Sequence, residues 1–102
     1  MSALAINKDN FNSVKEQDKT VLLDFYADWC GPCRAVSPIV DEIAKERDDI
    51  VVGKINVEKE PDLAKDFSIL SIPTLIVLKN GRVVNKASGA RPKAQILDLL
   101  NS

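Results

Sequence analysis

The stretch from Thr20 to Cys33, TVLLDFYADWCGPC, joins a run of β-branched and aromatic residues to two cysteines three positions apart. The run as far as residue 27 predicts a strand that is buried on both faces, with Asp24 as its only charged residue. A helix is expected to begin near Cys30–Cys33 and to continue to about Arg47, because apolar residues recur along it at helical spacing. The cysteine pair therefore lies where a buried strand meets a helix.

The rest of the chain alternates predicted strands and helices and then ends in a hairpin and a helix. Strands are predicted at residues 3–6, 20–27, 50–57, 74–79 and 82–87, and helices at residues 8–17, from Cys30–Cys33 to about Arg47 with a kink at Pro38, at residues 61–67, and from Pro92 onward. Asn80-Gly81, between the last two strands, is a strong hairpin signal. Because the first strands alternate with helices, they require right-handed crossovers and a parallel core, to which the hairpin adds antiparallel pairing. The predicted fold class is α/β, a three-layer sandwich with helices on both faces of a mixed sheet.

The length and the charge balance exclude several classes of protein. The 102 residues fit one domain, which we expect to span residues 1–102. With 14 basic and 15 acidic residues the net charge is −1, so the chain lacks the positive surface that binds a nucleic-acid backbone. Histidine is absent, which rules out Ser-His-Asp catalysis, Cys-His catalysis and His-ligated metals.

The start of the chain indicates the compartment. Its first nine residues carry neither the basic region nor the apolar run of a secretory signal, and no stretch of about 18 apolar residues could span a membrane. We therefore expect a cytoplasmic protein with no membrane partner. A mature secreted protein from which the signal had been removed would show the same sequence features. In a reducing cytosol, closely paired cysteines are more often catalytic or metal-binding than structural.

The spacing of Cys30 and Cys33 makes reversible oxidation geometrically easy. One helical turn separates their Cα atoms by about 5 Å, within the range that a disulfide requires. Cys30 lies at the helix N-terminus, where unpaired N–H groups favour a thiolate, so its pKa should fall, whereas burial should raise the pKa of Cys33. Pro32 suits the first turn and leaves the Cys33 N–H free to point at the Cys30 sulfur, and Gly31 lets a partner come close. Cys30 is thus the predicted nucleophile and Cys33 the resolving thiol.

Three alternative roles for the pair stay open at this point. A structural disulfide gains little from so short a loop, about 2 kcal/mol by chain entropy before strain is subtracted. A zinc or iron–sulfur site needs four ligands as a rule, and the chain offers two cysteines and no histidine, so no metal is expected. Two inert buried thiols are the third alternative. Dithiol–disulfide exchange accounts for the spacing best.

Two charged residues on the predicted buried strands are candidates for supporting roles. Asp24 is costly to bury, so its pKa should be raised, and it could then accept the proton of Cys33 through a water. The alternative is a solvated aspartate on an edge strand. Lys54, on the neighbouring strand, either pairs with Asp24 or extends to solvent past the end of the sheet.

A flat, uncharged surface is predicted around Cys30. Its members are Trp29, Pro32, Ile72, Gly89 and Ala90. Such a surface could bind segments of many proteins without requiring one sequence. Pro73 removes a strand donor and leaves the Ile72 backbone free to pair with a substrate strand. The alternatives are core packing of Trp29, an ordinary proline at a strand start and a simple turn at Gly89.

The segment from Phe25 to Cys33 resembles the thioredoxin family, and the likeness extends over nearly the whole chain. It includes, in family order and spacing, Asp24, Pro38, Lys54, the Ser71-Ile72-Pro73-Thr74 segment, the Lys79-Asn80-Gly81 turn and Gly89. The resemblance implies the thioredoxin fold, a central five-stranded mixed sheet flanked by four helices, with a cis bond before Pro73. Three positions depart from the family pattern: Tyr26 replaces a common Trp, Ser68 replaces a common Gly, and Leu70 makes its loop more apolar.

The same resemblance implies a function. It implies a protein-disulfide reductase that binds no cofactor, acts on disulfide-containing proteins and is re-reduced by an NADPH-linked thioredoxin reductase; we expect a monomer. Two alternatives are a binding or assembly module with incidental thiols, and a disulfide oxidase or isomerase of the same fold. Gly31-Pro32 favours the reductase, because no charge or histidine between the cysteines stabilises the thiolate further.

Overall fold

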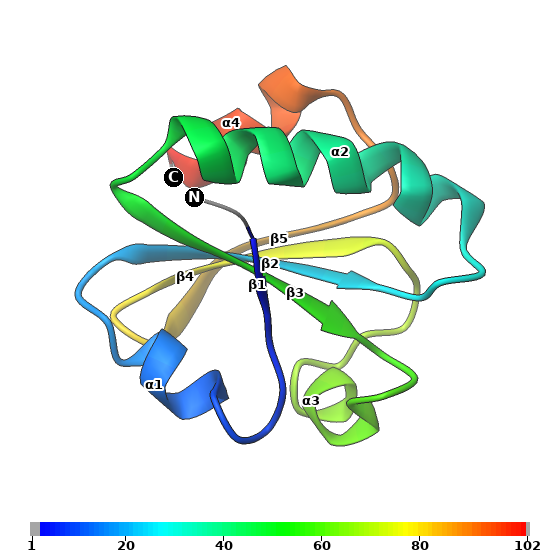
Figure 1. Ribbon diagram of the computed structural model, residues 1–102, viewed down its shortest axis with the longest axis horizontal. Coiled ribbons are helices and arrows are strands. Elements are labelled where there is room, and N and C mark those ends of the chain that lie inside the picture. Colours follow the sequence, from blue (N-terminus) through cyan, green and yellow to red (C-terminus); the bar gives the residue numbers. More distant parts are fainter. Residues whose placement is uncertain (1–2, 102) are drawn as a thin grey trace.

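The computed structural model describes residues 3–101 and arranges them in three layers (Figure 1). In chain order the elements are β1 (Leu4–Ala5), α1 (Phe11–Lys15), β2 (Thr20–Tyr26), α2 (Gly31–Glu46), β3 (Ile50–Asn56), α3 (Pro61–Asp66), β4 (Thr74–Lys79), β5 (Arg82–Ser88) and α4 (Lys93–Leu100). The order of element types is the one that the sequence predicts. The α/β class and the five-stranded mixed sheet with four helices are confirmed.

The sheet has the strand order β1-β3-β2-β4-β5. β2 lies at its centre, parallel to β3 and antiparallel to β4, so the strand that precedes the cysteines is shielded on both edges as well as on both faces. The hairpin between β4 and β5 turns at Asn80 and Gly81, whose φ angles of 54° and 76° are the left-handed pair that such a turn requires.

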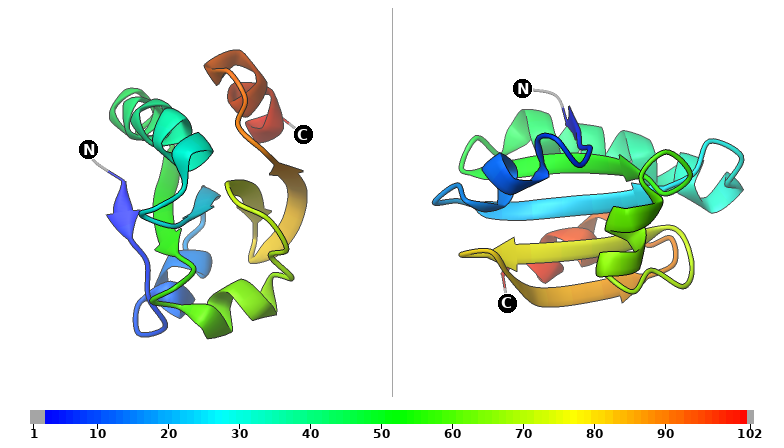
Figure 2. Two further views of the ribbon diagram at one scale, coloured as in Figure 1. Left: turned by 90° about the vertical axis from the view of Figure 1, so that its right-hand side faces the viewer. Right: turned by 90° about the horizontal axis from the view of Figure 1, so that it is seen from below.

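Helices cover both faces of the sheet. α2 and α4 pack on one face against alternate residues of the strands, among them Leu22 and Val52, while α1 and α3 pack on the other, against residues such as Leu23 and Phe25. Figure 2 shows the two helix layers from the side. Because α2 starts where β2 ends, its first turn reaches beyond the carboxyl end of the central strand.

The first helix is shorter than the predicted range of residues 8–17. The side-chain oxygen of Asn7 accepts hydrogen bonds from the N–H groups of Asp9 and Asn10, and the Asn10 side chain accepts one from the Asn7 N–H in return. These bonds hold residues 7–10 in a turn, because asparagine side chains compete with helical backbone bonding. The helix consequently begins only at Phe11.

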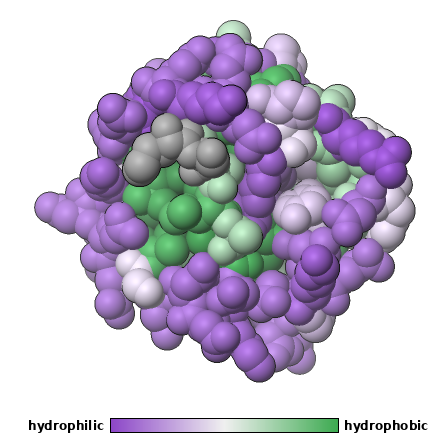
Figure 3. All heavy atoms as spheres, viewed as in Figure 1, coloured by the Kyte–Doolittle hydropathy of each residue, from purple (hydrophilic) through white to green (hydrophobic). Residues whose placement is uncertain are grey.

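The face seen in Figure 3 is mostly hydrophilic, and its most prominent apolar area lies over β1 and the start of β3. Ala3, Leu4, Ala44 and Val51 are among the residues that line a cavity of about 350 Å³ there. Across residues 3–101, no helix is long and apolar enough to cross a membrane.

Candidate active site

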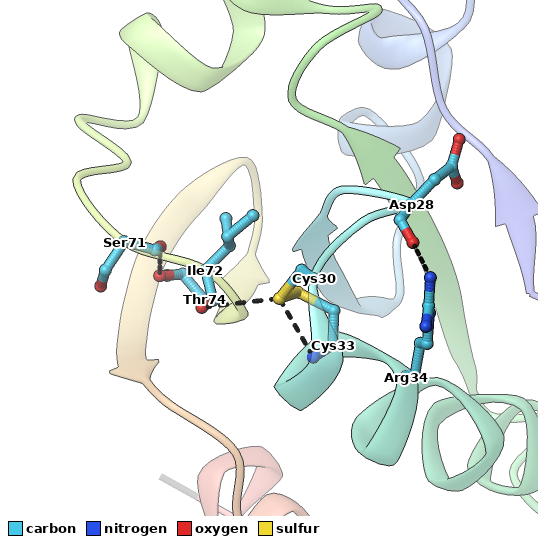
Figure 4. The surroundings of a disulfide bond; sticks show 7 residues. All are labelled: Asp28, Cys30, Cys33, Arg34, Ser71, Ile72 and Thr74. Atoms are coloured by element: carbon cyan, nitrogen blue, oxygen red, sulfur yellow. Dashed lines mark hydrogen bonds between the residues drawn. A yellow bond between two sulfur atoms is a disulfide. The ribbon is translucent and has the colours of Figure 1, made fainter.

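Cys30 and Cys33 form a disulfide at the start of α2 (Figure 4). Cys30 is the N-cap residue in extended conformation, and Cys33 lies in the first turn of the helix behind Pro32. Their Cα atoms are 5.2 Å apart, as the helical spacing predicts. The local sequence explains the position, since Pro32 lacks only a donor that the first helical turn leaves unpaired.

The two sulfurs differ in their hydrogen bonding and not in their exposure. Cys30 Sγ accepts a hydrogen bond of 3.2 Å from the Cys33 backbone N–H and lies 3.9 Å from the Ile72 carbonyl oxygen. The predicted contrast in burial is wrong for the disulfide form, because the residues are 4% and 3% exposed. The difference comes from the helix start, where the Cys33 N–H points at Cys30 Sγ.

The loop that faces the disulfide is held in place from two sides. The Ile72–Pro73 peptide bond is cis, as the family resemblance implies, and Ile72 packs against the buried cluster that Ala27 forms with the two cysteines. The Gly89 N–H donates to the Pro73 carbonyl at 2.8 Å, and Thr74 Oγ1 donates to the Ser71 carbonyl at 2.7 Å. Gly89 has a φ of 93°, so the conformation that places its N–H favours glycine. These bonds fix the Ile72 carbonyl beside Cys30.

Asp24 is a buried carboxyl on the central strand, which excludes the solvated edge position. It is 1% exposed, and neither of its carboxyl oxygens has a hydrogen-bond partner within residues 3–101. Burial raises its pKa to about 7, with a smaller raising effect from Asp41 that is opposed by Lys54. A carboxyl with this pKa can bind and release a proton near neutral pH.

Lys54 takes neither of the two positions predicted for it, the pairing with Asp24 or the extension into solvent. It is the cross-strand partner of Asp24, but its ammonium donates to Ser37 Oγ at 2.6 Å and forms an ion pair of 2.8 Å with Asp41 Oδ1. The side chain is 18% exposed, so it does not extend freely into solvent. The direct pairing with Asp24 is therefore corrected to pairing with α2, because the Asp41 carboxylate and the Ser37 hydroxyl hold the ammonium.

Ser37 and Asp41 are the polar neighbours that sequence reasoning missed. Together with Cys33 they recur every four residues along α2, which places the three side chains on one face of the helix. That spacing was available in the sequence, but Ser37 and Asp41 reach Lys54 only because α2 packs across β3. A shallow cavity of about 240 Å³ lies beside this face and is lined by Cys33 and Ser37, among others.

The residues of the surface predicted around Cys30 are exposed, except for Ile72. Trp29 is 65% exposed, which excludes core packing, and Pro32, Gly89 and Ala90 are exposed as well. Ile72 is half-buried against the disulfide. The open space where Gly31 would carry a Cβ leaves the first turn accessible.

Two further residues lie on the segments that carry this site. Leu70 is 98% exposed and belongs to the loop that leads to Ile72. Arg34 donates from its guanidinium to the Asp28 carbonyl at 3.0 Å, which ties the segment before Cys30 to α2 (Figure 4). Among the side chains of residues 3–101, no group of three or more His, Cys, Asp or Glu is placed to hold a metal ion.

A disulfide at the start of a helix, a facing cis-proline loop and a buried carboxyl on the adjacent strand define a thiol–disulfide oxidoreductase. The redox pair belongs to the chain itself, so this chemistry needs no bound cofactor.

The comparisons with known proteins agree. The thioredoxin family model matches residues 2–102. A thioredoxin of Alicyclobacillus acidocaldarius is 42% identical over 93% of this chain and 91% of its own length. A bifunctional thioredoxin reductase/thioredoxin of Mycobacterium leprae is 43% identical over 85% of this chain and 19% of its own. The solved structure of a mutant thioredoxin from Halobacterium salinarum superposes with a TM-score of 0.92, at 32% identity over 98% of this chain and 88% of that one.

The chain belongs to the thioredoxin family. Its activity is dithiol–disulfide exchange through Cys30 and Cys33, and the binding-module alternative is not favoured.

Proposed function

We propose that the reduced chain transfers two electrons to disulfides of other proteins in two steps. The Cys30 thiolate attacks one sulfur of the substrate disulfide, the substrate S–S bond breaks, and the leaving sulfur takes a proton. Cys33 then loses its proton and attacks Cys30 Sγ. The mixed disulfide breaks, the second substrate sulfur leaves as a thiolate, and the chain is oxidised to the Cys30–Cys33 disulfide.

The single observation that carries this assignment is the hydrogen bond from the Cys33 N–H to Cys30 Sγ. The N-cap sulfur is the one that the helix start stabilises as an anion, and a thiolate is the attacking species. Cys33 Sγ is bonded to Cys30 Sγ in the oxidised chain, so in the reduced chain it can reach Cys30 Sγ and attack it once Cys30 has formed the mixed disulfide with the substrate.

Asp24 is the proposed acceptor of the Cys33 proton. Its buried oxygens have no hydrogen-bond partner within residues 3–101, and burial raises its pKa to about 7, so the carboxylate is a competent base near neutral pH. Water can enter the cavity that is lined by Cys33 and Ser37, among others, and can therefore reach Cys33. This access supports transfer of the Cys33 proton through a water molecule.

The exposed residues around Cys30 form the proposed substrate-binding surface: Trp29, Pro32, Ile72, Gly89 and Ala90, to which we add Leu70. Within residues 3–101 the Ile72 N–H donates no hydrogen bond, so an extended substrate segment could pair with it while its disulfide meets Cys30. The exposed faces of Trp29 and Leu70 would bind apolar side chains of that segment.

A thioredoxin reductase, linked to NADPH, is the proposed electron donor. The likeness to part of a bifunctional thioredoxin reductase/thioredoxin supports this pairing. We further propose that the chain acts as one domain over residues 1–102, as a monomer, and in the cytoplasm, because a pair that must return to the dithiol is best kept in a reducing compartment.

Reduction of a disulfide-bonded model protein by a small dithiol tests the proposal. The native chain should accelerate the reaction, Cys30→Ser should abolish the acceleration, and Cys33→Ser should accumulate a mixed disulfide through Cys30. Mass spectrometry of the trapped adduct identifies the cysteine. Trapping through Cys33 in the Cys30→Ser variant at the same rate would overturn the assigned roles.

A further inference from the structure

The ammonium of Lys54 is held on α2 although its own strand position is next to Asp24. In the parallel pairing of β2 with β3, Asp24 and Lys54 are direct partners, and their side chains share the face that α2 covers. Lys54 Nζ is nevertheless fixed by two short contacts, 2.6 Å to Ser37 Oγ and 2.8 Å to Asp41 Oδ1. Both contacts come from one helix face, four residues apart.

We propose that Asp41, assisted by Ser37, is a positioning residue that retains the Lys54 ammonium on α2 and so keeps the Asp24 carboxyl free of a direct ion pair. The other strand neighbour of Asp24 is the apolar Leu75, which offers the carboxyl no charge or hydrogen-bond donor from its side chain. The inference rests on the proposed function only in its kinetic consequence; the effect on Asp24 itself is independent of what Asp24 does.

The charges that face Asp24 act with opposite signs. Lys54 from β3 lowers the pKa of Asp24 and Asp41 from α2 raises it, while burial has the largest effect and raises it. Removing the charge of Asp41 has two consequences in the same direction. The raising effect of Asp41 is lost, and the released ammonium can approach the Asp24 carboxylate and stabilise it.

The direct test is titration of the Asp24 carboxyl by carbon NMR in the oxidised protein. Asp41→Asn should lower the pKa of Asp24 by about one pH unit, and Ser37→Ala should lower it less, because the ion pair survives. Lys54→Met should raise it. Opposite shifts are expected from the two charges alone, so the positioning role is decided by combining the two substitutions.

Glu42→Gln is the matched control, since Glu42 is the next residue on α2 and pairs with Lys93 of α4 instead. It should leave the titration of Asp24 unchanged. The positioning effect is isolated by measuring Asp41→Asn again in the Lys54→Met background, where the shift should shrink to that of the lost charge alone. An equal shift in both backgrounds, or no shift in either, would overturn the proposal.

The kinetic consequence is measured on the release of substrate from the mixed disulfide. The acid limb of its pH–rate profile should move to lower pH in Asp41→Asn and to higher pH in Lys54→Met. If Asp24→Asn leaves the rate of this step unchanged, the assignment of Asp24 as the base is wrong. The NMR titration of Asp24 still tests the positioning role of Asp41 in that case. If Asp24→Asn slows the step but Asp41→Asn changes neither the acid limb of the pH–rate profile nor the pKa of Asp24, the positioning role alone fails.

Discussion

Both faces of the central sheet pack against apolar cores, but they differ at the position of Asp24. Beneath α1 and α3 the core is a close-packed apolar cluster in which the ring of Phe25 lies 5.5 Å from that of Phe67. Beneath α2 and α4 the same strand places a carboxyl, Asp24, next to the strand position of Lys54. Both faces therefore supply stability, but the face under α2 also gives up some stability to bury a carboxyl that has no hydrogen-bond partner within residues 3–101.

Replacing Phe25 by Ala tests the apolar packing beneath α1 and α3 and should have the largest effect on folding. Phe25 is fully buried, so its truncation leaves a cavity and should lower the free energy of unfolding by about 3–5 kcal/mol. Urea denaturation at pH 7 measures this change. Trp29→Ala is the contrast, since its exposed ring should change stability by no more than about 0.5 kcal/mol while slowing substrate reduction. Similar losses of stability in the two variants would contradict the view that Phe25 stabilises the core whereas Trp29 does not.

Replacing Asp24 by Asn tests the functional face through pH. The pKa of Asp24 is raised from 3.8 to about 7 in the folded chain, so the folded state binds this proton more tightly than the unfolded state. Stability should then fall as pH rises from about 4 to about 7, by up to about 4 kcal/mol.

The asparagine variant lacks this titration and should be more stable than the native chain at pH 8, with the advantage vanishing below pH 4. Denaturation curves at several pH values decide the matter. A native chain whose stability follows that of the variant at every pH would mean that Asp24 is charged in the folded state without cost.

Replacing Ser68 by Gly tests a smaller feature at the edge of the site. Ser68 has a φ of 54°, a conformation that costs a serine more than a glycine, at the end of α3. Lys86 donates to the Phe67 and Ser68 carbonyls and fixes this turn. Glycine should raise the free energy of unfolding by about 0.5–1 kcal/mol, which a slightly higher midpoint of thermal unfolding would show. A lower midpoint would show that the entropy gained by the unfolded glycine chain outweighs the relief of strain.

The fold was predictable because its signals are local and repeated. The run before Cys30, the prolines at helix starts and the Asn80-Gly81 turn each determine one element, and their order leaves few topologies. The start of α1 was missed because the reciprocal hydrogen bonds of Asn7 and Asn10 depend on the turn that they themselves create.

The site was predictable in its residues but not in all of its contacts. The positions of Cys30, Cys33, Asp24 and Trp29 follow from the end of one strand and the start of one helix. The partner of Lys54 does not, because Asp41 and Ser37 reach it only after α2 has packed across β3. The nearly equal burial of the two cysteines is likewise a property of the closed disulfide and its facing loop.

The pH dependence of alkylation of each cysteine in the reduced chain distinguishes the two sulfurs without relying on any substrate. The start of α2 should hold Cys30 as a thiolate well below the ordinary thiol pKa of about 8.5, so Cys30 should react at pH values where Cys33 remains protected. Peptide mapping after partial labelling separates the two sites. Labelling of Cys30 and Cys33 at equal rates across the pH range would contradict the assignment of Cys30 as the nucleophile.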